Sequence, residues 1–252
     1  MRWIGNCFQK LRKASGKHGY TCDGCGEELF EYPAHRLCTA CENKIERNEK
    51  YRCDKCGRKT FTEGVCLTCK SRMPLFDKGF SPFVYRGETA SLVNRLKNSD
   101  RRLACYFGEQ MSADFLQAFA STPILEEELL VIPVPLTKEK ERERGYNQAR
   151  ELAEVVIDCL HARKISARLE TDAVQKLRET KQQKHLTAVE RMENAIGAYH
   201  LHKRKIFEGK RVLLVDDILT TGATGSACAR LIKKAGAKSV YLLTIASLPE
   251  RK

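Results

Sequence analysis

One stretch near the carboxyl end of the chain, VLLVDDILTTGATG, joins an apolar run to two adjacent carboxylates and a loop of hydroxyls and glycine. The carboxylates are Asp216 and Asp217, and the loop residues are Thr220, Thr221, Gly222, Ala223 and Thr224. Such a loop at a helix start presents backbone N–H groups to an anion, and the helix dipole favours phosphate there. Ionised carboxylates only accept hydrogen bonds, so the pair suits a vicinal diol. The stretch predicts a site for a ribose 5-phosphate; the alternative, a helix N-cap, needs only one carboxylate.

Eight of the twelve cysteines form four C-x-x-C pairs before residue 70. They are Cys22, Cys25, Cys38, Cys41, Cys53, Cys56, Cys66 and Cys69. Four thiolates complete one tetrahedral zinc, so eight predict two closed, structural zinc sites. A redox dithiol in one pair is the alternative. The spacing does not decide between sequential and interleaved sites, and we favour the sequential order. The solitary cysteines, Cys7, Cys105, Cys159 and Cys228, are expected to be small buried or half-buried apolar residues.

The elements that would position the carboxylates and the loop alternate along the rest of the chain. Strands are predicted at 128–135, 174–177, 198–201, 211–215 and 239–246, and helices at 90–96, 103–119, 147–160 and 226–234. Strands alternating with helices indicate an α/β fold, with a parallel sheet covered by helices on both faces. The segment that follows the strand at 128–135 would lie at the carboxyl edge of this sheet, where open α/β sheets bind ligands.

Composition changes along the chain. The net charge is +13, and the net positive charge per residue is about twice as high in the first 75 residues as in the rest. A stretch with Pro74, Gly79 and Pro82 follows the last cysteine pair and predicts a boundary near residues 72–78. We therefore expect an N-terminal extension (1–19), a double zinc ribbon (20–72) and an α/β domain (79–252). No apolar run has the length of a signal peptide or a membrane span, so a cytoplasmic protein without membrane insertion is expected.

The residues VLLVDDILTTGAT resemble the phosphoribosyl pyrophosphate (PRPP) signature of type I phosphoribosyltransferases. The resemblance implies that fold for the second domain. It also implies that Asp216 and Asp217 hold the ribose hydroxyls as catalytic groups. The loop from Thr220 to Thr224 would then cradle the 5′-phosphate, and PRPP would bind with Mg²⁺.

Two further segments resemble the ComF/GntX family, in which zinc ribbons precede such a domain. The segment IPVPLTKEKERERGYNQARELA, from Ile132, implies PRPP contacts by Arg144, Asn147 and Gln148. Arg144, with Arg142 and Lys140, would meet pyrophosphate, because a guanidinium matches phosphate oxygens with two parallel N–H groups. The segment TKQQKHLTAVERMENAIGAY, from Thr180, carries further matches to that family. The resemblance implies that residues 178–194 form a mobile lid, as in related enzymes, and offers Arg191 as a catalytic contact. A solvated surface helix is the alternative for that segment.

The family resemblance implies a competence protein that acts in the uptake of transforming DNA beside a DNA-translocating helicase. Two functions fit the motifs: transfer of phosphoribosyl from PRPP to an unidentified acceptor, or PRPP sensing without turnover, coupled to single-stranded DNA or helicase binding. The basic residues Arg52, Lys55, Arg58 and Lys59 around one C-x-x-C turn are expected to face a DNA backbone or an acidic protein surface. The nearby aromatics Tyr20, Tyr51 and Phe61 fit the small core of a zinc ribbon better than base stacking.

Overall fold

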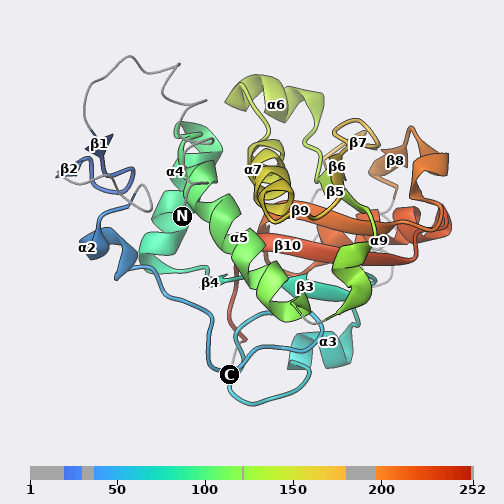
Figure 1. The fold of residues 1–252 in the computed structure, drawn as a ribbon, viewed down its shortest axis with the longest axis horizontal. Coiled ribbons are helices and arrows are strands. Elements are labelled where there is room, and N and C mark those ends of the chain that lie inside the picture. Colours follow the sequence, from blue (N-terminus) through green and yellow to red (C-terminus); the bar gives the residue numbers. More distant parts are fainter. Residues whose placement is uncertain (1–19, 30–36, 121, 180–196, 251–252) are drawn as a thin grey trace.

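The computed structural model describes residues 20–29, 37–120, 122–179 and 197–250. Its centre is a six-stranded sheet with the order β3-β10-β9-β5-β6, and β4 also pairs with β10 (Figure 1). Every pairing in this sheet is parallel, so the carboxyl ends of its strands share one edge. The predicted parallel α/β sheet is confirmed. The strands are β3 (Lys78–Phe80), β4 (Phe83–Val84), β5 (Leu129–Pro133), β6 (Ala167–Leu169), β9 (Arg211–Leu219) and β10 (Ser239–Ser247).

Each face of the sheet has its own core because side chains alternate along the strands. Leu213 and Val215 of β9 pack in one core, and Val212 and Leu214 pack in the other. The first core is closed by α4 (Gly87–Asn98), α5 (Leu103–Phe119) and α7 (Gln148–Ala162), which lie together in Figure 1. The second is closed by α9 (Ala223–Lys234) and the 3₁₀ turn η2 (Arg204–Phe207). A further 3₁₀ turn, η1 (Pro123–Glu126), precedes β5.

Some elements differ from the sequence predictions. Strand β9 does not stop before the two aspartates but continues to Leu219, because β10 runs beside it to Ser247. A short helix, α6 (Lys138–Arg144), replaces the expected loop after β5; the Thr137 side chain caps its first turn, and Gly145, with φ 75°, ends it. Strands β3 and β6 show no strand signal in the sequence: β3 contains Gly79 in the stretch interpreted as a domain boundary, and β6 has the charged Arg168 at its centre.

A small antiparallel pair, β7 (Val174–Lys176) with β8 (Tyr199–Leu201), stands beside the main sheet. It flanks the segment that was interpreted as a lid. Of that segment only Arg178 and Glu179 are described, so Arg191 lies outside the described residues.

The first cysteine group comprises β1 (Tyr20–Thr21), β2 (Glu28–Leu29) and α2 (Thr39–Glu42). Its buried Cys22 and Cys41 belong to the same core as α4 and α5. Arg95 of α4 anchors the group by donating to the backbone carbonyls of Asp23 and Gly24. This group therefore rests on the helices of the first face.

The second cysteine group contains α3 (Leu67–Ser71), and its four cysteines join the opposite core, next to Phe76 and Leu242. Gly57 and Gly79 approach so closely that a Cβ on Gly57 would lie 2.3 Å from the Gly79 carbonyl oxygen. Figure 1 shows α3 far from β1, β2 and α2. The two cysteine groups thus pack in the cores of opposite faces of one sheet. Cys105, Cys159 and Cys228 are buried as expected, whereas Cys7 lies outside the described residues.

Candidate functional site

The eight paired cysteines form two clusters, Cys22–Cys25–Cys38–Cys41 and Cys53–Cys56–Cys66–Cys69. Within each cluster the sulfurs lie within 4.8 Å of one another. Four sulfurs placed about 2.3 Å from a central zinc form a tetrahedron with edges of roughly 3.8 Å. The Cys25–Cys38 and Cys56–Cys66 sulfur distances are both 3.8 Å. The clusters therefore fit zinc, in the sequential grouping favoured from the sequence.

Backbone N–H groups around both clusters point at sulfur, as expected where thiolate charge must be stabilised. Cys22 Sγ accepts from the N–H of Cys38 at 3.1 Å, and Cys53 Sγ accepts from the N–H of Cys66 at 3.3 Å. All four cysteines of the second cluster are at most 2% exposed, whereas Cys25 of the first is exposed. The second cluster is therefore part of the protein interior, and the first is open on one side.

Asp216 and Asp217 lie near the carboxyl end of β9. Strand β5 pairs with β9 only as far as Val215, so beyond that residue β9 has no strand partner on this side. The Asp217 carboxylate accepts from Gln148 Nε2 at 2.7 Å, and Lys97 Nζ of α4 lies 3.4 Å from the same oxygen. Asp216 has no such cation against it among the described residues; its Oδ1 accepts the backbone N–H of Asp217 at 2.9 Å.

The two carboxylates are electrostatically unequal. Burial, together with the Asp217 carboxylate beside it, raises the pKa of Asp216 from 3.8 to about 7. Asp216 thus takes up a proton close to neutral pH when nothing is bound. A bound cation, or hydroxyls that donate to the carboxylate, would favour its ionised form.

The loop after β9 has the geometry of an anion site. Thr220 and Thr221 are exposed, and Gly222, with φ 76°, starts α9 without a side-chain cap. The first N–H groups of a helix have no carbonyl partner within the helix. Tyr199 of β8 is buried in the core that also holds α9. The loop therefore offers hydroxyls and backbone donors a few residues after the carboxylates.

The residues predicted from the segment after β5 meet the carboxylates only in part. Arg144 donates to Gln148 Oε1 at 3.0 Å, which links α6 through Gln148 to Asp217. Asn147 lies nearby, but its side chain caps α7 at Ala149 N and donates to the Val134 carbonyl. The Asn147 side chain therefore positions the start of α7 against the chain at Val134.

Other basic residues of α6 differ in their surroundings. Lys140 pairs with Glu179 at 3.2 Å, and Glu179 also accepts from Lys176 at 2.9 Å. Arg142 is exposed. The Lys140–Glu179 pair ties the beginning of the 178–194 segment to α6.

Sequence reasoning missed Lys97. This residue comes from a helix 120 positions before Asp217, with no motif around it, and only the packing of α4 brings it to the carboxylate.

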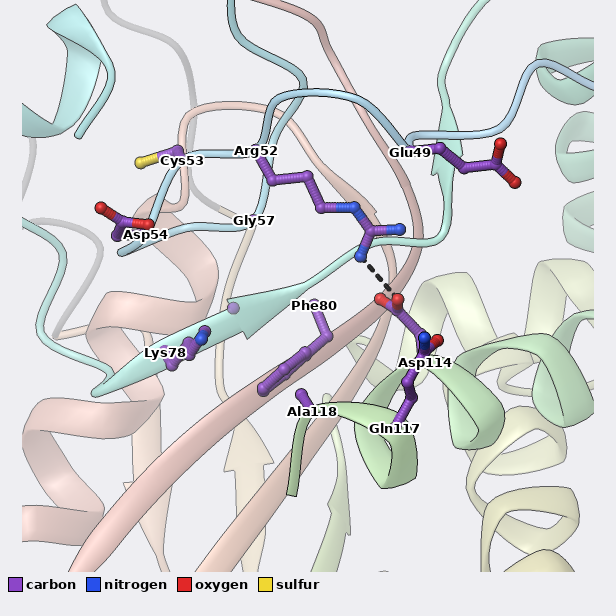
Figure 2. Close-up of a pocket in the computed structure, with 11 residues that line it drawn as sticks. Glu49, Arg52, Cys53, Asp54, Gly57, Lys78, Phe80, Asp114, Gln117 and Ala118 are labelled. Carbon is purple, nitrogen blue, oxygen red and sulfur yellow. Dashed lines mark hydrogen bonds and ion pairs between the residues drawn. The ribbon is translucent and has the colours of Figure 1, made fainter. Parts of the chain in front are cut away.

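One expectation about the basic residues around Cys53 and Cys56 is wrong. Arg58 is only 5% exposed, so it does not face a DNA backbone. Figure 2 shows Arg52 reaching across a cavity of about 500 Å³ to Asp114 of α5, at 2.5 Å. Lys59 pairs with Glu46 at 2.6 Å. The Arg52–Asp114 pair holds the second cysteine group on α5, whereas the Lys59–Glu46 pair lies within the cysteine-containing region.

Comparison with known proteins defines the class. Residues 144–252, which hold the aspartates, the loop and α7, match the phosphoribosyl transferase domain family. The chain thus carries a phosphoribosyltransferase domain behind two four-cysteine clusters. Among solved structures, a hypoxanthine phosphoribosyltransferase from Staphylococcus aureus is similar with a TM-score of 0.37 and 15% identity, covering 64% of this chain and 73% of that chain.

Relatives match over most of the chain. The competence protein ComFC of Bacillus subtilis (strain 168) is 28% identical over 221 residues, covering 84% of this chain and 85% of that protein. The DNA utilization protein YhgH of Escherichia coli O6:H1 is 28% identical over 208 residues, covering 82% and 88%. The chain is a homologue of these ComFC and YhgH proteins. No helix of the described residues is long and apolar enough to span a membrane.

Proposed function

We propose that the site at the end of β9 binds PRPP together with Mg²⁺. Asp216 and Asp217 accept hydrogen bonds from the ribose hydroxyls, and the loop from Thr220 to Thr224 binds the 5′-phosphate. The observation that carries this proposal is the succession of two carboxylates, exposed hydroxyls and a helix start with glycine as its N-cap, within nine residues at one strand end. The high pKa of Asp216 also fits a carboxylate whose partners arrive with the ligand.

The proposed reaction is transfer of the phosphoribosyl group to an acceptor. Pyrophosphate leaves C1 of the ribose as the acceptor attacks, and among the described residues of the site no side chain is placed as a nucleophile. Arg144 contacts the amide oxygen of Gln148, whereas Asp217 contacts its amide nitrogen. At that position the guanidinium can bind pyrophosphate oxygens. Mg²⁺, when bound, neutralises part of the charge of the leaving pyrophosphate. Arg191 stays a proposed contact, supported by the resemblance of its segment.

We place this activity in DNA uptake or DNA use. The support is that two relatives, named as a competence protein and a DNA utilization protein, align over more than four fifths of the chain. A DNA-translocating helicase and single-stranded DNA are the proposed partners.

Calorimetric titration with PRPP and Mg²⁺ tests the site. Asp216→Asn with Asp217→Asn should reduce affinity at least tenfold, because each hydrogen bond to a charged group is worth about 1.5–3 kcal/mol. Glu139→Gln with Glu143→Gln, on the exposed part of α6, removes the same charge and is the matched control. Unchanged affinity in the aspartate variant would assign the loop to another ligand.

Turnover separates the enzyme from a sensor. Pyrophosphate release that depends on an added acceptor supports transfer, and tight PRPP binding without release for any acceptor supports sensing. An acceptor screen should include free bases, nucleosides and single-stranded DNA, each with the double aspartate variant as the blank.

One observation favours a protein-docking role for the second cysteine group. Three large apolar side chains there are more than half exposed: Phe61, Leu67 and Met73. Leu67→Ser with Met73→Ser should then abolish capture of the helicase and leave PRPP affinity unchanged.

Binding to single-stranded DNA is distinguished by its salt response, since each phosphate contact contributes about 0.7 to the slope of log affinity against log salt.

A further inference from the structure

Arg58 joins the second cysteine cluster to the loop after β9. Its Nε lies 3.4 Å from Cys56 Sγ, and one terminal nitrogen donates to the Thr220 carbonyl oxygen at 2.7 Å. The two ends of this contact are 162 residues apart in the chain. Arg58 is 5% exposed, so this guanidinium is a buried connection between two sites.

A buried cation is costly unless an opposite charge lies close to it. Four thiolates around one Zn²⁺ carry a net charge of about −2. Cys56 belongs to that set, so the loaded cluster supplies the charge that Arg58 needs. Hydrogen bonds to ligand atoms also orient the groups around a metal. The position of the guanidinium therefore depends on the state of the cluster.

The other end of the contact sets the direction of one peptide group of the loop. The peptide unit is planar and trans, so the N–H of Thr221 points opposite to the carbonyl of Thr220. With that carbonyl held by Arg58, the Thr221 N–H points to the opposite side of the loop. Thr221 and Gly222 lead directly into α9. A fixed donor at this position favours anion binding, because no conformational entropy is lost in orienting the N–H group when the anion binds.

Further contacts make the loop and the second cluster one packed unit. Ser226, in the first turn of α9, accepts from the N–H of Leu75 at 3.3 Å. The Phe76 ring lies 3.6 Å from the position of a Cβ on Gly222. The first cluster is instead anchored on α4 through Arg95. Among the described residues, the second cluster is thus the one in contact with the loop.

We propose that Arg58 is a positioning residue for phosphate binding and that it couples metal occupancy of the second cluster to the PRPP affinity of the loop. This inference rests on the proposed binding of PRPP. By thermodynamic linkage, PRPP must in turn stabilise the metal-loaded second cluster.

Two substitutions test the affinity arm. Arg58→Gln should lower PRPP affinity about 10- to 100-fold, as expected for loss of a hydrogen bond from a charged donor. Arg58→Lys keeps the charge but offers one point donor in place of a fork, so it should recover part of the loss. Arg95→Gln, at the first cluster, is the matched control and should stay within about twofold of wild type. Zinc content is measured for every variant.

Cysteine alkylation tests the reciprocal arm on the wild-type protein. PRPP should slow alkylation of peptides that carry Cys53 to Cys69 and leave the rates at Cys22 to Cys41 unchanged. The same protection should be absent in Arg58→Gln. This readout reports the metal site directly, and its wild-type part holds even if Arg58→Gln does not fold.

The outcomes separate the two proposals. A wild-type protein that does not bind PRPP overturns the proposed function, and the coupling with it. PRPP binding that is unchanged in zinc-loaded Arg58→Gln overturns the coupling alone. Equal protection of both clusters, or of neither, also overturns it.

Discussion

Replacing Asp216 by asparagine should change how the stability of the ligand-free protein depends on pH. The pKa of Asp216 is about 7 in the folded chain and 3.8 for an ordinary aspartate. The folded state therefore holds the proton more tightly than the unfolded state. The stabilisation from this proton is complete below about pH 4 and is lost as pH rises through 7.

The magnitude follows from the difference in pKa. Each pH unit is worth about 1.4 kcal/mol, and the two values differ by about three units. The free energy of unfolding should therefore fall by up to about 4 kcal/mol between pH 4 and pH 8. Solvent that reaches the partly exposed carboxyl reduces this figure, so about 2 kcal/mol is expected. For a chain of this size that is roughly 4–8 °C in Tm.

Thermal unfolding of zinc-loaded protein without PRPP, at steps between about pH 5 and 8, is the assay. Asp216→Asn cannot ionise at this position, so it should exceed wild type in Tm at pH 8, and the difference should narrow as the pH falls to 5 and close only below about pH 4. Subtracting the two profiles removes effects of pH on the zinc thiolates, since both proteins carry the same clusters.

A second substitution is the control. Asp217→Asn removes the charge beside Asp216, so the pH-dependent range should move to lower pH; it also leaves Lys97 without its partner oxygen. Parallel pH profiles for wild type and Asp216→Asn would refute the assigned pKa and the electrostatic inequality of the two carboxylates.

The remaining predictions concern the cysteine groups. Gly57→Ala should destabilise the protein by more than about 2 kcal/mol, because φ is 72° and the added Cβ meets the Gly79 carbonyl; Gly26→Ala, with φ 80° and open space, should cost only about 1 kcal/mol by chemical denaturation. Elemental analysis should find about two zinc ions per chain. Cys53→Ser should lower Tm far more than Cys25→Ser, because Cys53 is 1% exposed within a core and Cys25 is exposed; equal losses would contradict the unequal burial of the clusters. PRPP affinity should survive Cys25→Ser and fall in Cys53→Ser.

Much of the site was predicted from the sequence because its chemistry is local. Cysteines with two residues between them in a turn point at one centre, and a strand followed by hydroxyls and glycine leads into a helix start. The ligand sets, the two carboxylates and the loop are each continuous or nearly continuous in the chain. The parallel sheet followed from the alternation of strands and helices, whereas β3 lies in the glycine- and proline-containing stretch interpreted as a boundary and β6 contains no apolar run.

Tertiary structure alone decided which distant residues meet. Lys97 and Gln148 converge on Asp217 because α4 and α7 pack on the same face of the sheet. Arginine is usually exposed to solvent, but the packing of the second cluster beside β9 buries Arg58 against Cys56 and Thr220. The order of strands in the sheet determines which of these residues come into contact. Residue periodicity does not give this order, because it specifies which face of a strand is buried but not which strand lies beside it.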